Sequence, residues 1–191
     1  MQNSSTDRPE TGALDAWMAA HVPGFAGPVS IVPLTGGQSN PTWRVESSGA
    51  TYVLRQKPLG PVLPSAHAVD REFRVLDALR ASAVPVPRVH ALCEDPAIMG
   101  SMFYVMDHVP GRVLFDPRLP GMTPQDRAAT YASMNRTAAA IHTVDPDAVG
   151  LSDFGRAGGY AARQVARWTR QYLASETDPL TVHDVVLVAR R

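Results

Sequence analysis

Residues 34–41 read Leu34-Thr35-Gly36-Gly37-Gln38-Ser39-Asn40-Pro41, and this glycine-rich stretch joins two segments with the composition of β-strands. Residues 29–34 precede it and residues 42–46 follow it, both enriched in residue types that favour strands. A third such segment, residues 51–56, comes after the turn Ser47-Ser48-Gly49. The pattern predicts an antiparallel meander whose first two strands are connected by a glycine loop.

The glycine loop has the residue types of a phosphate-binding loop. Gly36 and Gly37 would let backbone N–H groups approach a phosphate closely. Hydroxyl and amide groups that could be aimed at phosphate oxygens follow at Gln38, Ser39 and Asn40. The same residue types are common in hairpin turns that bind nothing. Taken alone, the loop leaves both interpretations open.

The third predicted strand places a cation on the same side as the loop. Side chains alternate along a strand, so Val53 and Arg55 share one face, where Val53 would contact a flat base and Arg55 a phosphate. Lys57, the only lysine, has the same parity, but Pro58 after it indicates that the strand is ending. A solvated arginine on an edge strand is the alternative.

A helix predicted for residues 68–80 carries the third element, Glu72. Apolar residues recur there at helical spacing, and Glu72 borders this stripe because it lies one turn from Val69 and from Leu76. A carboxylate at the edge of a buried face needs a cation, and Arg55 is the natural partner. A local pair with an arginine of the same helix is the alternative.

The remaining elements predict an α+β protein. Residues 86–92 and 102–106 are two more strand candidates. Thr123 as N-cap and Pro124 after it predict a helix that runs to about His142. A second helix is predicted to begin near Gly159. Strands with one helix, followed by helices, indicate a protein of two lobes.

Composition excludes several classes of partner. Lys+Arg and Asp+Glu both number 18, so the formal net charge is zero and neither a nucleic acid nor an anionic membrane is the expected partner. Cys93 is the only cysteine and is expected to be a small core residue. No apolar run approaches the roughly 18 residues of a membrane-spanning helix, and residues 1–10 lack a signal sequence. We therefore expect a cytoplasmic protein.

Taken together, the motifs resemble the aminoglycoside phosphotransferase family, which has a protein-kinase-like fold. The branch that they resemble most contains the kinase-like domain fused to acyl-CoA dehydrogenases, as in acyl-CoA dehydrogenase family members 10 and 11. The resemblance covers about residues 14–177. The matching segments are Gly36-Gly37-Gln38-Ser39-Asn40-Pro41, Tyr52-Val53-Leu54-Arg55, Arg71-Glu72-Phe73, Phe103-Tyr104-Val105-Met106-Asp107-His108-Val109-Pro110-Gly111 and Ala140-Ile141-His142-Thr143-Val144-Asp145.

The resemblance implies an α+β fold with a kinase-like N-lobe, followed by the first helices of a helical C-lobe. It divides the chain into a tail and short helix (residues 1–27), the N-lobe (28–107), a hinge with a partial C-lobe (108–179) and a tail unlike the family (180–191). It also implies ATP as cofactor, Mg²⁺ in the intact family, and a small-molecule hydroxyl as phosphoryl acceptor. The residues expected to bind the nucleotide are Gly36, Gly37, Gln38, Ser39, Asn40, Val53, Arg55, Glu72 and the hinge residues Met106, Asp107, His108 and Val109.

The catalytic loop of the family has no counterpart in the sequence. That loop needs an Asn five residues after its Asp to hold Mg²⁺, yet the last asparagine is Asn135. Asp153-Phe154-Gly155 spells a kinase metal motif but lies too close to Asp145, so it is expected to be a turn. We therefore expect no catalytic and no metal-binding residue here.

These features lead to three expectations about the chain as a whole. It would be a frameshifted or prematurely terminated family member that is inactive. The alternative is a non-catalytic remnant that binds a nucleotide or a partner. Arg55 and Glu72 would form an ion pair beneath the glycine loop. The apolar stripes of the last two helices, which include Ile141, Trp168 and Tyr172, would stay partly exposed and make the chain unstable.

Overall fold

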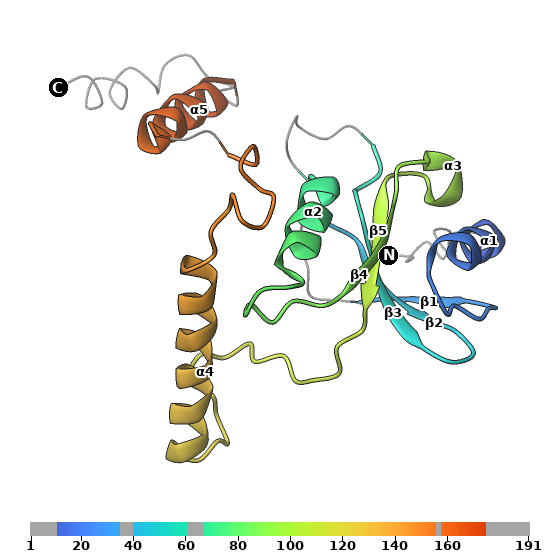
Figure 1. The fold of residues 1–191 in the computed structure, drawn as a ribbon, viewed down its shortest axis with the longest axis horizontal. Coiled ribbons are helices and arrows are strands. Elements are labelled where there is room, and N and C mark those ends of the chain that lie inside the picture. The colour runs from blue at the N-terminus through green and yellow to red at the C-terminus, as the bar shows by residue number, and fades with distance from the viewer. Residues whose placement is uncertain (1–10, 35–39, 61–66, 156–157, 175–191) are drawn as a thin grey trace, which may run out of the picture. The chain divides into compact units, whose positions relative to one another are not determined.

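The computed structural model describes residues 11–34, 40–60, 67–155 and 158–174. The chain divides into two compact units, Met1–Leu151 and Ser152–Arg191, and each is described by itself. The first contains a five-stranded antiparallel sheet in the order β1-β2-β3-β5-β4 (Figure 1). The strands are β1 (Ser30–Pro33), β2 (Thr42–Glu46), β3 (Thr51–Gln56), β4 (Val89–Cys93) and β5 (Phe103–Asp107).

The described part of the chain also contains five helices, the last of which belongs to the second unit. They are α1 (Thr11–His21), α2 (Val69–Leu79), α3 (Pro96–Met99), α4 (Pro124–His142) and α5 (Tyr160–Ala174). The α+β architecture with an antiparallel sheet confirms the predicted fold class.

The bounds predicted for β2, β3 and α4 are confirmed, whereas those predicted for β4 were less accurate and one short helix was missed. The strand predicted for residues 86–92 begins only at Val89, because Pro85 and Pro87 lack the N–H group that a ladder requires. Helix α3 was not predicted at all. It has four residues, too few for a periodic pattern, and is capped by Asp95, which accepts a hydrogen bond from the Ala97 amide (2.8 Å).

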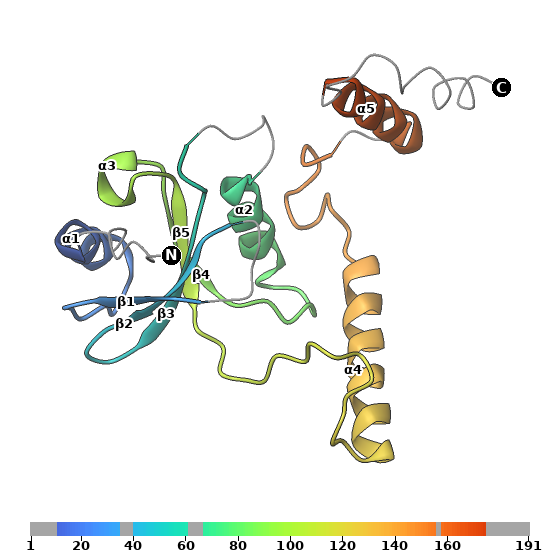
Figure 2. The same cartoon turned by 180° about the vertical axis from the view of Figure 1, so that it is seen from behind.

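The alternation along β3 sorts its side chains between two cores. Helices α1 and α2 lie on opposite faces of the sheet (Figures 1 and 2). On the α1 side, the buried residues include Leu14, Met18, Tyr52, Leu54, Cys93, Phe103 and Val105. On the α2 side, Val69, Val89 and Tyr104 are buried, and Phe73, Leu76 and Met106 pack against them. Arg55 therefore points away from the larger core and toward α2.

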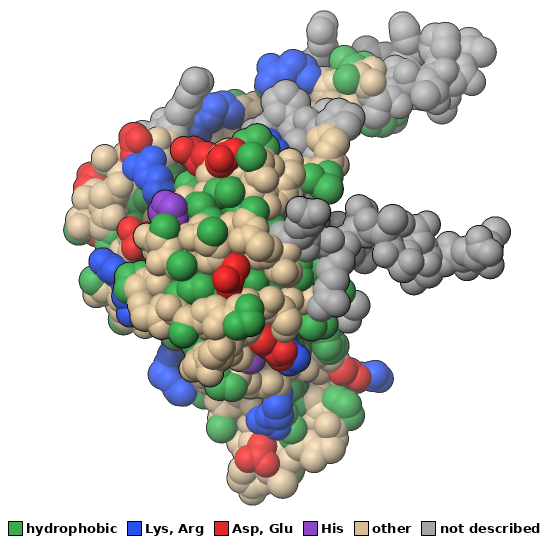
Figure 3. All heavy atoms as spheres, turned by 90° about the vertical axis from the view of Figure 1, so that its right-hand side faces the viewer, with side chains coloured by type: hydrophobic (Ala, Val, Ile, Leu, Met, Phe, Trp, Pro, Cys, Tyr) green, Lys and Arg blue, Asp and Glu red, His purple; other side chains and the backbone are tan. Residues whose placement is uncertain are grey.

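The surface on the α1 side mixes both signs of charge. Figure 3 shows acidic and basic side chains interspersed with small hydrophobic groups on this face. This distribution agrees with the net charge of zero. None of the helices within the described ranges is both long and apolar enough to cross a membrane.

Gln56, at the end of β3, is a buried polar residue that links three elements. Its side-chain carbonyl accepts a hydrogen bond from the Trp43 indole N–H (3.1 Å), and its amide donates to the Met99 carbonyl (2.6 Å). Gln56→Leu is expected to lower the free energy of unfolding by about 1–3 kcal/mol, because the buried Met99 carbonyl and the partly buried Trp43 indole would lose their hydrogen bonds. Urea unfolding measures the change, and a loss below about 0.5 kcal/mol would contradict the role of Gln56.

Helices α4 and α5 bury none of their described side chains. The predicted N-cap is present, since the Thr123 hydroxyl accepts a hydrogen bond from the Asp126 amide (3.1 Å). The predicted exposure is also confirmed: Ile141 is 51% exposed, Trp168 62% and Tyr172 46%. Capping by Thr123 therefore supports α4, which buries no described side chain.

Candidate functional site

Arg55 lies in the middle of the sheet, between two polar neighbours. Strand β3 pairs with β2 on one side and with β5 on the other, which sets Arg55 opposite Thr42 and opposite Tyr104. Directly paired residues of antiparallel strands point to the same face. The sheet register thus brings a guanidinium, a hydroxyl and a phenol together on the α2 side.

Arg55 forms the predicted ion pair with Glu72 of α2. Its Nε lies 2.5 Å from Oε2 of Glu72, and its Nη2 lies 3.4 Å from Oε1. The two side chains are 30% and 35% exposed, so the pair is accessible from solvent on one side. The hydrogen bond to Glu72 raises the pKa of Arg55 despite partial burial, which keeps the guanidinium charged. The choice of Arg55 over Lys57 as the partner of Glu72 is confirmed.

Two further donors hold the Glu72 carboxylate. The Asn40 side-chain amide donates to Oε1 (3.0 Å), and the Tyr104 hydroxyl donates to Oε2 (3.3 Å). Each carboxylate oxygen therefore accepts from Arg55 and from one neutral group. A carboxylate with this many donors is restricted in its rotamer, and it fixes the direction of the Arg55 guanidinium.

Tyr104 is buried beside this carboxylate, and its ionisation is suppressed. Burial raises the pKa of the Tyr104 phenol, and the negative charge of Glu72 raises it further. The sequence had not singled out Tyr104. Its position opposite Arg55 depends on β5 lying next to β3, which the strand pattern does not specify.

This burial predicts a pH dependence of stability. Because the pKa of Tyr104 is higher in the folded protein, the unfolded chain loses its proton first, near pH 10, and stability should fall as the pH rises above that value. Tyr104→Phe should flatten the decline between about pH 9.5 and 11, by up to about 1.4 kcal/mol per pH unit. Urea unfolding at several pH values measures this, with Tyr131→Phe as the control. Parallel curves for Tyr104→Phe and wild type would contradict the assignment.

Asn40 closes a ring of hydrogen bonds around the ion pair. Asn40 is 5% exposed, and its backbone carbonyl accepts a hydrogen bond from the Thr42 hydroxyl (3.1 Å). The Thr42 hydroxyl in turn accepts a hydrogen bond from Nη1 of Arg55 (3.3 Å). The side-chain oxygen of Asn40 lies 2.8 Å from Nδ1 of His67. The amide that we expected to face a phosphate thus points to Glu72, because a buried amide must satisfy its polar atoms. Gly36, Gly37, Gln38 and Ser39 lie outside the described residues.

The other predicted site residues lie along β3 and at the end of β5. Val53 is buried on the Arg55 side of β3, opposite Met106. Beyond Met106, the Asp107 amide donates to the Arg88 carbonyl (2.8 Å), and the His108 amide to the Thr51 carbonyl (3.4 Å). The expected hinge therefore begins as an extension of the sheet, and Val109 is exposed.

His90 contacts the carboxylate of the hinge residue Asp107. Nε2 of His90 lies 2.6 Å from Oδ1 of Asp107, and the His90 ring packs edge-on against Tyr52 (centroids 5.4 Å apart). The ring is almost wholly buried, and its Nδ1 has no hydrogen-bond partner among the described residues. A position in the strand predicted for residues 86–92 was the only signal in the sequence, and it does not indicate this contact.

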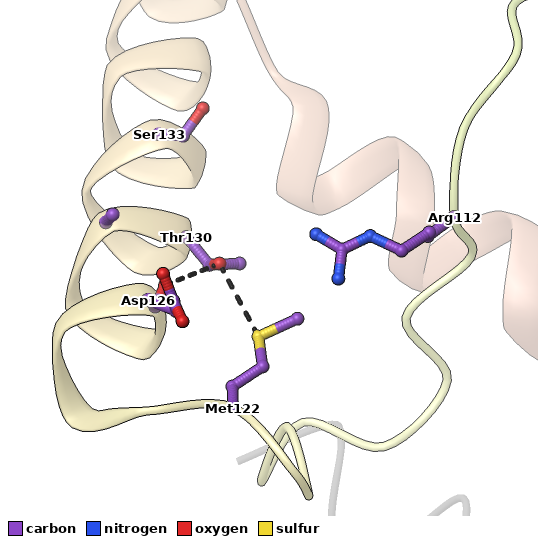
Figure 4. Close-up of a pocket in the computed structure, with 6 residues that line it drawn as sticks. Arg112, Met122, Asp126, Thr130 and Ser133 are labelled. Atoms are coloured by element: carbon purple, nitrogen blue, oxygen red, sulfur yellow. Dashed lines mark hydrogen bonds between the residues drawn. The ribbon is translucent and has the colours of Figure 1, made fainter.

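A cavity of about 530 Å³ lies apart from these residues, between the chain after the hinge and α4 (Figure 4). In Figure 4 the Arg112 side chain extends from that segment toward the helix, where the Thr130 hydroxyl donates to the Asp126 carbonyl (2.8 Å). The lining residues are Arg112, Met122, Asp126, Ala129, Thr130 and Ser133. The cavity shares no residue with the ion-pair cluster.

The apparent metal motif is a turn. Asp153 lies in a turn, and Phe154 and Gly155 lie in the bend that follows, as expected. No group of three or more His, Cys, Asp and Glu side chains within residues 11–34, 40–60, 67–155 and 158–174 could hold a metal ion.

An antiparallel sheet with a strand cation paired to a helix glutamate resembles the N-lobe of protein kinases, although the strand cation here is Arg55 and theirs is a lysine. A model of the phosphotransferase enzyme family, APH, matches residues 30–190. The chain belongs to this family, which confirms the resemblance seen in the sequence.

Known proteins agree with this assignment. A crystal structure of a protein from Ralstonia eutropha JMP134, assigned to the aminoglycoside phosphotransferases, is 51% identical with a TM-score of 0.75, and the match covers 90% of this chain and 49% of that one. Acyl-CoA dehydrogenase family member 10 of Mus musculus is 47% identical over 154 residues, which is 81% of this chain and 14% of the relative. Family member 11 of Homo sapiens is 39% identical over 170 residues, or 87% of this chain and 22% of the relative. The chain thus spans less than a quarter of the length of these two curated relatives.

Proposed function

We propose that the chain carries the nucleotide-binding lobe of an ATP-dependent phosphotransferase whose acceptor is a hydroxyl group of a small molecule. The observation that carries this proposal is the Arg55–Glu72 pair, oriented by Asn40 and Tyr104 on the face of β3 that also presents Val53. Family membership supports the phosphotransferase class. A cytoplasmic location, and the absence of nucleic-acid and membrane partners, stay predictions.

The hydrogen bonds of Arg55 leave it able to bind a phosphate. A guanidinium has five N–H groups, and the described contacts use three of them: Nε and Nη2 on Glu72, and Nη1 on Thr42. One N–H on each terminal nitrogen is left for an anion. Two N–H donors of one planar guanidinium match two oxygens of a phosphate. Arg55 would therefore stand where protein kinases have a lysine, and it would bind the phosphate through two hydrogen bonds.

The hinge would bind the adenine through a limited set of groups. The amides of Asp107 and His108 already donate to protein carbonyls, the second over a long 3.4 Å. An adenine edge would therefore use the Val109 amide or displace the His108–Thr51 bond. Buried Val53 would contribute apolar contact to the base, as the sequence predicts.

We further propose that residues 1–191 alone bind the nucleotide without transferring its phosphate. In phosphoryl transfer, catalysis rests mainly on positioning and on neutralisation of charge by metal ions and their carboxylate ligands. The described residues contain no such group of ligands, and no asparagine follows Asn135 in the sequence. The alternative function, a non-catalytic remnant that binds a nucleotide or a partner, uses the same contacts.

Titration calorimetry with ATP, with and without Mg²⁺, tests these proposals. We expect binding weaker than about 1 µM, because the described contacts form only one wall of a cleft and lack metal anchoring. We also expect the affinity for ATP to be the same with and without Mg²⁺. Absence of binding would overturn the nucleotide site, and sub-micromolar binding would overturn the expectation of weak affinity. Magnesium-dependent ATP turnover would show that the chain is an active enzyme.

A further inference from the structure

Asn40 and His67 form a contact that ties the end of the glycine loop to the start of α2. Asn40 lies next to Pro41 and β2, and His67 lies two residues before Val69, the first residue of α2. Nδ1 of His67 and Oδ1 of Asn40 are 2.8 Å apart, although 27 residues separate them in the sequence.

The direction of this hydrogen bond follows from its neighbours. The Asn40 amide nitrogen donates to the Glu72 carboxylate, so the amide oxygen must face His67 as an acceptor. The opposite amide orientation would set two acceptor oxygens against each other at Glu72. Nδ1 of His67 therefore carries a hydrogen and donates it to Asn40.

His67 keeps this position at a conformational cost. Its φ is +59°, in the left-handed region that residues other than glycine rarely occupy, which costs of order 1 kcal/mol. The His67 carbonyl accepts a hydrogen bond from the Val69 amide (2.9 Å), and this bond is closed by the turn conformation of Ala68 (φ −76°, ψ 79°). Helix α2 has no side-chain cap at Ala68, so this bond helps to satisfy its first turn. His67 thus contacts the helix start through its carbonyl and Asn40 through its ring.

We infer that His67 is a positioning residue of the nucleotide site: its Nδ1–H holds the Asn40 amide on Glu72 and so fixes the Arg55 guanidinium toward the phosphates. This inference rests on the proposed function. It differs from the ion pair itself, because Arg55 and Glu72 can pair without Asn40. What the histidine adds is a fixed orientation for the carboxylate and a fixed distance between α2 and the residue that ends the glycine loop.

Substitutions at His67 separate the side-chain donor from the backbone conformation. His67→Asn retains both, because its amide nitrogen is attached to Cγ as Nδ1 is, and because Asn tolerates positive φ. His67→Gly retains the conformation and loses the donor. His21→Asn, in α1 on the opposite face of the sheet, is the matched control, since the only side-chain hydrogen bond that the structure gives His21 is with the Trp17 carbonyl.

We expect His67→Gly to weaken ATP binding by about five- to tenfold in a calorimetric titration. His67→Asn and His21→Asn should bind as wild type does. Adenosine, which lacks phosphates, should bind equally to all four proteins. Asn40→Ala should reproduce the loss, and the double variant His67→Gly/Asn40→Ala should bind no more weakly than Asn40→Ala alone. Cooperative melting confirms that each variant is folded.

Two outcomes separate this inference from the function on which it rests. If wild type does not bind ATP, the proposed function fails and the inference fails with it. If wild type binds ATP and His67→Gly binds equally well, or if its loss extends to adenosine, only the inference is overturned. Exchange of the Asn40 side-chain amide protons, measured by NMR without nucleotide, provides a second readout. They should exchange slowly in wild type and His67→Asn and quickly in His67→Gly, and equal rates would overturn the contact.

Discussion

Arg55→Ala is expected to reduce ATP affinity by at least roughly 10- to 100-fold, since even one hydrogen bond to a charged group contributes about 1.5–3 kcal/mol. The substitution removes the only cation that the described residues place on Glu72, and with it the two N–H groups that remain for a phosphate. Arg55→Lys should give an intermediate loss, because an ammonium keeps the charge but cannot form a two-pronged contact.

Variants of Glu72 distinguish a direct from an indirect effect of Arg55. Glu72→Ala leaves the Arg55 guanidinium and the buried Asn40 amide without their acceptor, so it should lower both ATP affinity and the free energy of unfolding, the latter by about 1–3 kcal/mol. The double variant Arg55→Ala/Glu72→Ala should lose less ATP-binding free energy than the sum of the losses in the two single variants. Arg80→Ala is the matched control, because Arg80 pairs with Asp77 at the exposed end of α2. Equal affinities for wild type and Arg55→Ala would refute the proposed phosphate contact.

Limited trypsin digestion should leave a protected N-lobe fragment and degrade the chain beyond it. Both hydrophobic cores are built only from residues between Leu14 and Met106, so the sheet with α1 and α2 keeps its buried surface without the later helices. Helices α4 and α5 bury no described side chain and expose large apolar ones. Arg112 is exposed directly after Gly111, so we expect a fragment that ends there.

A matched variant identifies the cleavage site. Arg112→Gln removes it, and the fragment should then end at Arg118, which is also exposed. Mass spectrometry of the fragments measures both ends. The intact chain should in addition self-associate through its exposed apolar side chains. A monomeric chain that melts in one cooperative step and resists trypsin through Tyr172 would contradict this prediction.

Much of the site was predictable because the relevant signals are local. Alternation along residues 51–56 placed Val53 and Arg55 opposite Tyr52 and Leu54, and the two-sided burial of β3 follows that alternation. Helical spacing around Glu72 identified the partner of Arg55, and the proline after Lys57 correctly argued against Lys57. Capping residues set the start of α4 at Pro124.

The sequence by itself therefore determined the family, the two faces of β3 and the ion pair, because periodicity and motif order are properties of short segments. Only the tertiary structure decided which groups surround that pair. Placing β5 between β3 and β4 brought Tyr104 beside Glu72. The left-handed backbone of His67 brought its ring to Asn40, and Asn40 turned inward to satisfy its amide. Such contacts depend on strand order and on the hydrogen-bonding needs of buried atoms, which no local pattern encodes.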